Sequence, residues 1–430
     1  MEETTNKRRR SSAKKNSAPT SSVDKPTSTR GEMLKVVGTA FKRNLRNMDW
    51  YIVIPYIILC VFGTVMIYSA SVWWAIVQYD SPPDHYYIRQ LRFLVMGFVL
   101  ASFAALISYR IYREKTIMWL IAGGTLLLLG LVHIIGYGKD TVGSQSWISF
   151  GFFSLQPSEM AKLGIILILS GLIANRMRVQ SIQDISYKRY ILYLVFPVLC
   201  LFSIGNETDL GAVIIVAGIT VSIYMLSGIP FKKFAIFTGG MGLAMGLAIA
   251  FMALATDIFN GSRLGRFEAW FNPFEHARDT GYQIVQGYLA IGAGGLEGVG
   301  LGQSSQKLGF IPEPQTDFIM AVISEEMGFI GVLLVVGLLY LIVCRALFIA
   351  LTTKDPFARM VAGAIGVWIG LQTCINLGGM VGFLPLTGVT LPFISYGGSS
   401  LILLSLAIGI LINISINEKI RKRKKHKGEG

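Results

Sequence analysis

The sequence KLGFIPEPQTD, residues 307–317, runs directly into FIMAVISEEMGFIGVLLVVGLLYLIVC, residues 318–344. The second stretch exceeds the roughly 20 apolar residues that a helix needs to cross the hydrocarbon core of a bilayer. The first stretch therefore brings Lys307, Glu313 and Asp317 to the point where an extramembrane loop re-enters the membrane. Ionisable side chains at that depth are costly, so their presence indicates a functional site.

Apolar runs of similar length recur on both sides of this stretch. Of the 430 residues, 53% are hydrophobic and 15% are charged, which excludes an ordinary soluble domain. We expect an all-α polytopic membrane protein with ten transmembrane helices. The expected helices cover approximately residues 51–72, 90–108, 116–136, 158–174, 190–205, 210–228, 234–256, 318–344, 358–381 and 399–416.

The distribution of basic residues predicts the orientation of these helices. Lys and Arg concentrate at the two chain ends and in alternate loops, namely residues 1–50, 109–115, 175–189, 229–233, 345–357 and 417–430. Because cytoplasmic loops carry an excess of Lys and Arg, both termini are expected in the cytoplasm. The outward-facing loops are then residues 73–89, 137–157, 257–317 and 382–398. The formal net charge of +14 thus reflects topology and contact with anionic lipids, and no nucleic-acid partner is expected.

Three regions follow from this division. Residues 1–48 are polar and basic, so we expect a disordered cytoplasmic tail. Residues 49–416 form the membrane domain, and residues 417–430 form a second basic cytoplasmic tail. The cysteines and histidines show no metal-ligand spacing, so a structural zinc site is not expected. The cysteines all lie in apolar stretches and are expected to be small core residues: Cys60, Cys200, Cys344 and Cys374.

The longest predicted loop, residues 257–317, is unusual, because long ordered loops in compact proteins are generally functional. Residues 281–292 are expected to form a short interfacial helix. The glycines from Gly295 to Gly302 superficially suggest a phosphate-binding loop, but no strand precedes them and no Gly-Lys-Ser/Thr follows. Tight turns, or a close approach of the backbone to a ligand, explain these glycines better.

The outer loop 137–157 leads into a predicted ion pair. Pro157 fits the first turn of a helix, and Glu159 would lie near the positive end of the helix dipole. Lys162 follows about one turn deeper on the same face. The resulting salt bridge is either purely structural or also positions a substrate. Asp209 is expected to cap the helix that begins at residue 210.

The last outer loop, PLTGVTLPFISYGGSS at residues 385–400, combines prolines, glycines and hydroxyl groups. Such irregular backbone at membrane depth is tolerated only where protein or a wet cavity surrounds it. This loop, the outer acids and four cations can all face one outward cavity. The cations are Lys162, Arg263, Arg266 and Lys307.

An anionic ligand carried by a lipid suits this cavity. Neither ATP nor nucleotide sugars are available outside the cell, so an activated donor has to arrive attached to a membrane-soluble leaving group. A polyprenyl diphosphate meets that condition, and the cations can stabilise the negative charge that develops on it.

Ordered motifs along nearly the whole membrane domain resemble those of the SEDS family, the shape, elongation, division and sporulation proteins. The matching segments are Ser69-Ala-Ser71, Gly143 to Lys162 with Trp147, Asp209-Leu-Gly211, Gly281-Tyr-Gln283, Gly300 to Lys307, Pro312-Glu313, Thr316-Asp317-Phe318, Glu325-Glu326 with Gly328, and Leu391 to Ser400. Within the family, the chain resembles the members that act in cell division more than those that act in elongation. The segments that carry this resemblance are Asn272-Pro-Phe274, residues 306–310 and the basic tail.

The resemblance implies a peptidoglycan glycosyltransferase that polymerises lipid II at the outer face of the cell membrane, at the division septum. It implies a class B penicillin-binding protein and other division proteins as partners, and no organic cofactor. A divalent cation requirement stays open, and no metal ligand is assigned. Asp317 would be the catalytic base, although from the residues alone it, or Thr316, could equally cap the next helix. The residues expected to bind substrate are Glu159, Lys162, Trp147, Asp209, Arg263, Arg266, Lys307, Glu313, Thr316, Ser399 and Ser400.

Three positions depart from the family pattern. Glu207-Thr208 replaces a usual Gln-Pro, Gln315 replaces a common histidine, and Gln145-Ser146 replaces a frequent basic residue. No catalytic role is assigned to them. The alternatives are an elongation polymerase of the same family, a lipid II flippase, and a non-catalytic scaffold. A flippase predicts inverted repeats and polar residues on both membrane faces, and a scaffold would not need Asp317 or the Glu159–Lys162 pair.

Overall fold

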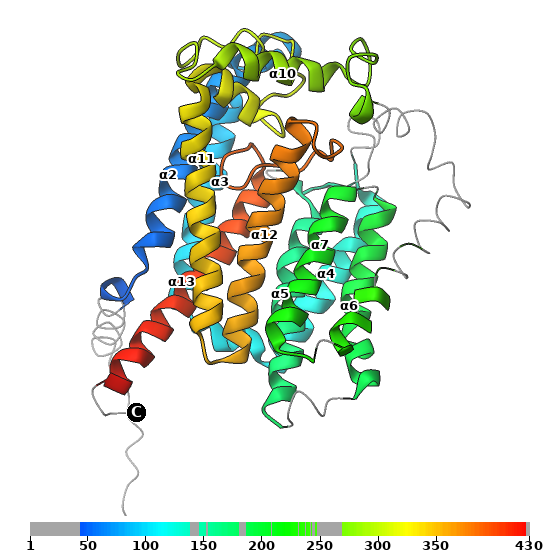
Figure 1. Ribbon diagram of the computed structural model, residues 1–430, viewed down its shortest axis with the longest axis vertical. Helices are drawn as coiled ribbons and strands as arrows, with labels where there is room; N and C mark the ends of the chain where they lie inside the picture. The colour runs from blue at the N-terminus through cyan, green and yellow to red at the C-terminus, as the bar shows by residue number, and fades with distance from the viewer. Residues whose placement is uncertain are drawn as a thin grey trace, which may run out of the picture. The chain divides into compact units, whose positions relative to one another are not determined.

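The computed structural model is mainly helical (Figure 1) and describes residues 44–137, 146–151, 154–179, 186–207, 209–230, 269–426 and parts of 232–246. The chain divides into two units between residues 46 and 47, and every helix and strand named below belongs to the second. Residues 1–43, most of the predicted disordered tail, lie outside the described residues. The elements are α2 (Trp50–Trp73), the π-helical turn η1 (Trp74–Gln78), α3 (His85–Leu106), the 3-10 helix η2 (Tyr109–Arg113), α4 (Lys115–Ile135), β1 (Ile148–Ser149), β2 (Ser154–Leu155), α5 (Pro157–Met177), α6 (Tyr187–Asn206), α7 (Leu210–Ser227), α10 (Tyr282–Gly294), α11 (Ile319–Thr352), α12 (Pro356–Met380) and α13 (Gly398–His426). The two strands pair antiparallel, with Ile148 opposite Leu155.

Eight helices of the described chain are long and apolar enough to cross a membrane: α2 with η1, α3, α4, α5, α7, α11, α12 and α13. The apolar part of α6, Ile191–Asn206, is shorter. Each of these nine helices overlaps one of the predicted spans. Most of the remaining predicted span, 234–256, lies outside the described residues. The total of ten spans therefore stays a prediction.

Local sequence signals set several helix ends. Pro157 occupies the first turn of α5, as predicted. Asp209 caps α7, where its Oδ1 accepts a hydrogen bond from the Ala212 amide at 2.9 Å, which confirms that prediction. α7 ends at Ser227, and the following Gly228 has a φ of 80°, the left-handed conformation that favours glycine.

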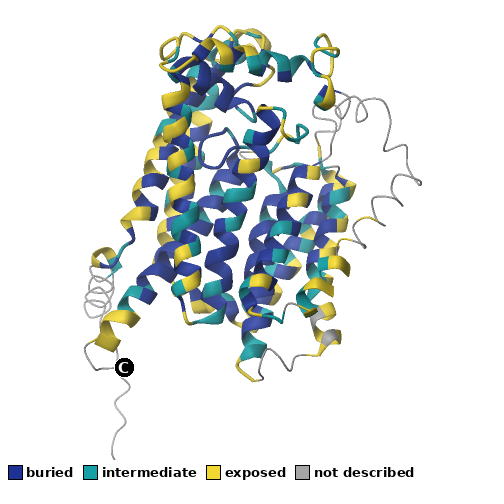
Figure 2. Cartoon of the chain, in the orientation of Figure 1, coloured by how far each residue is buried: buried dark blue, intermediate teal, exposed yellow. Residues whose placement is uncertain are grey.

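Small residues let the helices pack closely. α13 packs against α3, and α12 packs against both α7 and α11. A Cβ atom added at Gly409 of α13 would lie 2.3 Å from the carbonyl oxygen of Ala101 in α3. Buried residues line the helix contacts in Figure 2, whereas large apolar side chains such as Trp119 and Ile134 are exposed. Exposed apolar surface on long apolar helices is the surface that lipid covers, so the chain is a multi-pass membrane protein.

The helix α11 is interrupted at Gly328, which has φ 62° and ψ −163°. At this break the loop after α10 pairs with the α11 backbone: the Val299 and Gly300 amides donate to the carbonyls of Glu325 and Glu326 at 2.9 and 3.0 Å. A Cβ atom at Gly298 would lie 2.3 Å from the Glu326 carbonyl oxygen. A helix is present at the predicted position as α10, and its location at the membrane interface stays a prediction. Close contact with the α11 backbone thus explains the glycine at 298.

Candidate functional site

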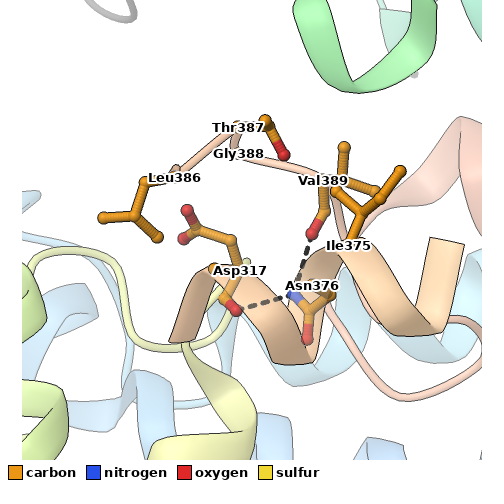
Figure 3. Close-up of a pocket in the computed structure, with 8 residues that line it drawn as sticks. Asp317, Ile375, Asn376, Leu386, Thr387, Gly388 and Val389 are labelled. Carbon is orange, nitrogen blue, oxygen red and sulfur yellow. Dashed lines mark hydrogen bonds between the residues drawn. The ribbon is translucent and has the colours of Figure 1, made fainter. Parts of the chain in front are cut away.

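Asp317 lines a pocket formed by the start of α11, the end of α12 and the last outer loop (Figure 3). In Figure 3 its carboxylate points toward the loop segment 386–388. The N-cap position of α11 is Phe318, whose side chain makes no capping hydrogen bond. Asp317 and Thr316 therefore lie one and two residues before the N-cap position. The other residues that line the pocket are Ile375, Asn376, Gly379, Leu386, Thr387, Gly388 and Val389.

The turn before Asp317 brings two further predicted site residues beside it. The Thr316 hydroxyl lies 2.7 Å from the Glu313 carbonyl oxygen and 3.1 Å from Asp317 Oδ1. Glu313 has a φ of 42°, an uncommon conformation for a residue with a Cβ atom. Its carboxylate accepts a hydrogen bond from the Tyr79 hydroxyl at 3.1 Å. Thr316 thus contacts Asp317 directly, and Glu313 shapes the turn that carries it.

Two amide side chains on α12 hold the last outer loop. Asn376 Nδ2 donates to the carbonyl oxygens of Asp317 and Val389, each at 2.8 Å. Gln372 Nε2 donates to the next loop carbonyl, that of Thr390, at 2.9 Å. The sequence analysis missed both amides. The available signal was a pair of polar residues four apart, and so on one helix face, inside an otherwise apolar span.

Glu159 and Lys162 form the predicted ion pair inside the bundle. Lys162 Nζ lies 2.5 Å from Glu159 Oε1, and only 1% of Lys162 is exposed. The amine also lies 5.5 Å from the centroid of the Trp368 ring on α12, within the range of a cation–π contact. The salt bridge itself is confirmed, and its role in binding substrate stays a prediction.

Side chains on α12 connect this pair with the Asp317 pocket. Trp368 contacts Lys162 and donates its Nε1 proton to Gln372 Oε1 at 2.8 Å. Trp368, Gln372 and Asn376 are spaced by four residues and share one face of α12. At 1.5 Å per residue, the step from Trp368 to Asn376 is about 12 Å along the helix.

Asp209 belongs to the same polar region as the ion pair. Gln156 Nε2 donates to Asp209 Oδ2 at 3.1 Å, while Oδ1 caps α7. Burial raises the pKa of Asp209, and the nearby Lys162 charge opposes that shift. Lys162 therefore acts on two carboxylates, Glu159 and Asp209.

Glu207, just beyond the end of α6, is a buried carboxyl group of a different kind. It is 2% exposed, and within the described residues neither of its oxygens has a hydrogen-bond partner at bonding distance. Burial, followed by the negative charge of Asp209, raises the pKa of Glu207 to about 8, and the Ser146 side chain partly offsets the rise. Glu207 is thus mainly protonated at neutral pH.

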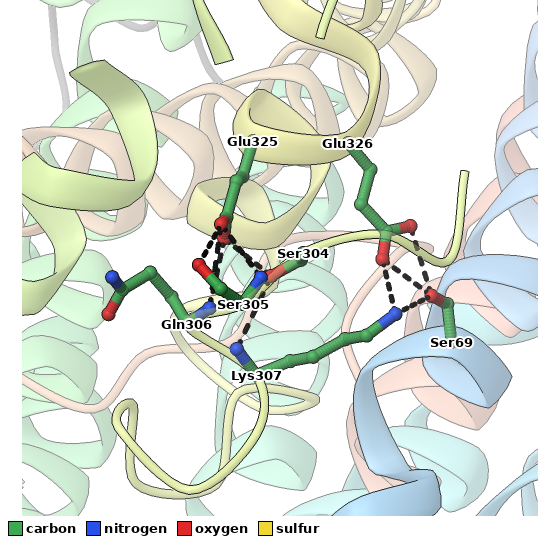
Figure 4. A network of polar contacts seen from close by, with 7 residues as sticks. All are labelled: Ser69, Ser304, Ser305, Gln306, Lys307, Glu325 and Glu326. Atoms are coloured by element: carbon green, nitrogen blue, oxygen red, sulfur yellow. Dashed lines mark hydrogen bonds and ion pairs between the residues drawn. The ribbon is translucent and has the colours of Figure 1, made fainter. Parts of the chain in front are cut away.

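Lys307, predicted among the substrate-binding cations, lies in a separate buried network (Figure 4). Its Nζ is 2.6 Å from Glu326 Oε1 and 2.9 Å from the Ser69 hydroxyl of α2. The neighbouring Glu325 accepts hydrogen bonds from the Ser305 amide and hydroxyl, both at 2.9 Å, and from the Ser304 hydroxyl. The network ties the outer segment to α11 and α2, so Lys307 has a structural role here. Its role in binding substrate stays a prediction.

The structure places the remaining predicted residues as follows. Ser400 Oγ lies 3.4 Å from Gln372 Nε2, and the buried Ser399 hydroxyl has no hydrogen-bond partner within the described residues. Trp147 is half-buried, and its carbonyl accepts a hydrogen bond from the Tyr137 amide at 2.9 Å. Arg263 and Arg266 lie outside the described residues. In the part of the chain that the structure describes, no three His, Cys, Asp or Glu side chains gather closely enough to hold a metal ion.

Comparisons with known proteins assign the chain to a family. The family of FtsW, RodA and SpoVE, described as cell cycle proteins, matches residues 49–420. The chain is 38% identical over 389 residues to a probable peptidoglycan glycosyltransferase FtsW of Bacillus subtilis, covering 90% of this chain and 95% of the relative. It is 37% identical over 370 residues to stage V sporulation protein E of the same species, covering 85% and 96%.

Solved structures agree with the sequence comparisons. A chain from a study of how a peptidoglycan synthase complex coordinates polymerization and crosslinking has a TM-score of 0.68 at 26% identity, covering 86% of this chain and 98% of that one. The rod shape determining protein RodA of Thermus thermophilus has a TM-score of 0.61 at 25% identity, covering 86% and 96%. Because the family match extends over nearly all of the membrane domain, the chain belongs to the FtsW/RodA/SpoVE family of cell cycle proteins.

Proposed function

We propose that this protein is a peptidoglycan glycosyltransferase that polymerises lipid II at the outer face of the cytoplasmic membrane during septal cell-wall synthesis. Family membership and the names of the FtsW relatives support the activity. The observation that carries the assignment of the site is the position of Asp317. Asp317 lines a pocket between α11, α12 and the last outer loop, and the Asn376 amide of α12 holds its backbone carbonyl.

In this proposal Asp317 is the general base. It removes the proton from the 4-hydroxyl of the acceptor GlcNAc while that oxygen forms a bond to the anomeric carbon of the donor MurNAc. The bond from that carbon to the diphosphate breaks, and the polyprenyl diphosphate leaves with the electron pair. Thr316, which contacts one Asp317 oxygen, orients the carboxylate for this transfer.

The Glu159–Lys162 pair lies deeper than Asp317 and is connected to it through α12. We propose that it stabilises the inner end of the substrate cavity, with Lys162 supplying positive charge toward the diphosphate. Arg263, Arg266 and Lys307 are the other cations proposed to act on the diphosphate. In this structure the Lys307 amine is paired with Glu326, so contact with substrate would require that pair to open.

The proposal includes ten membrane spans with both termini in the cytoplasm, so that the Asp317 pocket opens outward. The asymmetry of Lys and Arg between alternate loops supports this orientation. It also includes a class B penicillin-binding protein as the crosslinking partner. Similarity to a chain from a peptidoglycan synthase complex supports such a partner.

The decisive experiment incubates the purified protein with lipid II, with and without the partner, and resolves the products on a gel. We expect glycan ladders from the wild type and a loss of at least about 100-fold in the Asp317→Ala and Asp317→Asn variants. The matched control is Glu297→Gln, which alters an exposed carboxylate on the same outer segment. Melting temperature and partner binding should be unchanged in all three variants.

Three results would contradict the proposal. Ladders that persist in Asp317→Ala would move the base elsewhere. Wild-type protein that transfers lipid II between leaflets and forms no ladders would be a flippase. A protein that only supports polymerisation by another enzyme, regardless of Asp317, would be a scaffold.

A further inference from the structure

The amide of Asn376 joins the residue that carries the proposed base to the loop that faces it. Its Nδ2 donates one hydrogen bond to the Asp317 carbonyl and one to the Val389 carbonyl, both at 2.8 Å (Figure 3). The two carbonyls come from segments 59 and 13 residues away in the sequence. The Asn376 side chain of α12 thus fixes the segment before α11 and the last outer loop, which form the other two walls of the pocket.

The chemistry of the partners determines the orientation of this amide. Both partners are carbonyl oxygens, which only accept hydrogen bonds, so the NH₂ group has to face them. The reversed amide would place Oδ1 against two carbonyl oxygens. In Figure 3 the amide oxygen accordingly points away from the loop. Both protons of the NH₂ group are therefore used for positioning.

Asn376 lies in a packed part of the helix bundle. Asn376 is 5% exposed and lies near the end of α12, which packs against α7 and α11. One turn earlier, Gln372 holds the adjacent loop carbonyl of Thr390 and accepts a hydrogen bond from Trp368. The loop over Asp317 is thus held at consecutive residues from one helix face. Asp317 itself lies in the short turn before α11, one residue before the N-cap position at Phe318.

We propose that Asn376 is a positioning residue of the glycosyltransferase: by holding the Asp317 backbone and the Val389 backbone together, it sets where the Asp317 carboxylate meets the acceptor hydroxyl. This inference rests on the proposed function. Small displacements of a reacting group have large kinetic effects, because the reacting atoms have to lie within about 3–3.5 Å of one another. Asn376 itself does not contact the reacting atoms.

The test compares steady-state polymerisation of lipid II by Asn376→Ala, the isosteric Asn376→Asp and a matched control, Asn413→Ala. Asn413 is also a buried asparagine that joins two helices: it donates to the Ala105 carbonyl at 2.7 Å and accepts from the Tyr109 amide at 2.9 Å. It lies on α13, away from the pocket, and its loss removes a similar number of hydrogen bonds. Melting temperatures are recorded for every variant.

We expect kcat to fall by about 10- to 100-fold in both Asn376 variants, with KM changed by less than about threefold. The Asp variant is included because it keeps the side-chain volume but a carboxylate cannot donate to two carbonyls. Asn413→Ala should lose comparable thermal stability and keep kcat within about twofold of the wild type. Adding Asn376→Ala to Asp317→Ala should lower the residual rate no further, because the positioned group is already absent.

The inference is overturned if the Asn376 variants keep kcat within about twofold of the wild type, or lose no more than Asn413→Ala loses. If Asn376→Ala does not fold, Asn376→Asp is judged by the same criterion. Failure of the proposed function has a separate signature, namely an active Asp317→Ala variant. An inactive Asp317→Ala variant with fully active Asn376 variants would remove this inference alone.

Discussion

Replacing Lys162 with methionine should destabilise the protein by about 3–4 kcal/mol, because it leaves carboxylates inside the bundle without their cation. Lys162 is 1% exposed, and its amine is 2.5 Å from Glu159. It also lies close enough to Asp209 to oppose the effect of burial on the pKa of that group. Methionine keeps most of the side-chain volume, so the change removes mainly the charge.

The magnitude follows from two limits. Removing one partner of a buried ion pair generally costs about 3–5 kcal/mol. The cost is capped because the remaining carboxyl group can take up a proton instead, and protonating an ordinary glutamate at neutral pH costs about 4 kcal/mol. Loss of the cation–π contact with Trp368 adds less than about 1 kcal/mol.

The assay is the thermal unfolding of purified protein in detergent, followed by intrinsic fluorescence. Lys115→Met is the matched control, since Lys115 is exposed at the start of α4. The double variant Glu159→Gln/Lys162→Met should recover most of the lost stability, because it removes both charges of the pair. The part not recovered measures the interaction of Lys162 with Asp209.

One result would refute this reasoning directly. If Lys162→Met has the same melting temperature as the Lys115→Met control, the Glu159–Lys162 pair is accessible to water and its charges do not stabilise the fold. If Lys162→Met is destabilised but Glu159→Gln/Lys162→Met is equally so, the loss comes from packing of the lysine stem and not from the ion pair.

Two further predictions concern backbone contact and pH. Gly294→Ala should lower the melting temperature, by the equivalent of about 1–3 kcal/mol, because the added Cβ atom would lie 1.8 Å from the Ser324 carbonyl oxygen. The control is Gly292→Ala in the same helix, where an added Cβ atom meets nothing within 4 Å and should be tolerated. Equal melting temperatures of the two variants would count against the close backbone contact at Gly294. Burial raises the pKa of Glu207 from 4.5 to about 8, so the folded protein binds the extra proton and stability should fall as pH rises between these values, by at most about 1.4 kcal/mol per pH unit. Glu207→Gln should remove this slope, giving a variant more stable than the wild type at pH above 8 and similar below 4.5, measured as melting temperature against pH; a slope that survives the substitution would assign it to another group.

The features that could be predicted from the sequence are those whose causes are local. An apolar run long enough to span a bilayer becomes a helix because its backbone groups have to bond within the segment. The cap at Asp209 and the ion pair of Glu159 with Lys162 involve residues three apart. Such contacts follow from helix geometry alone.

Other features of the candidate site depend on contacts between distant segments. The residues alone leave Asp317 open as a base or a helix cap, and only the structure shows that the N-cap position of α11 is Phe318. The sequence shows that Trp368, Gln372 and Asn376 on α12 are four residues apart. Only the structure shows that this helix face contacts Lys162 at one end and Asp317 at the other. The sequence predicts Lys307 as a cation for substrate, and only the packed structure shows its amine beside Glu326 and Ser69.

The order of residues along the chain is sufficient to identify a helical membrane protein, to locate its apolar spans, and to show where acids and cations occur along them. Which of those groups meet depends on how the helices pack. Helix formation is governed by hydrogen bonds four residues apart and by the length of apolar runs. The partner of a buried side chain is governed by which helix faces pack together, and segments as distant as residues 69 and 326 are brought together only when the bundle has closed.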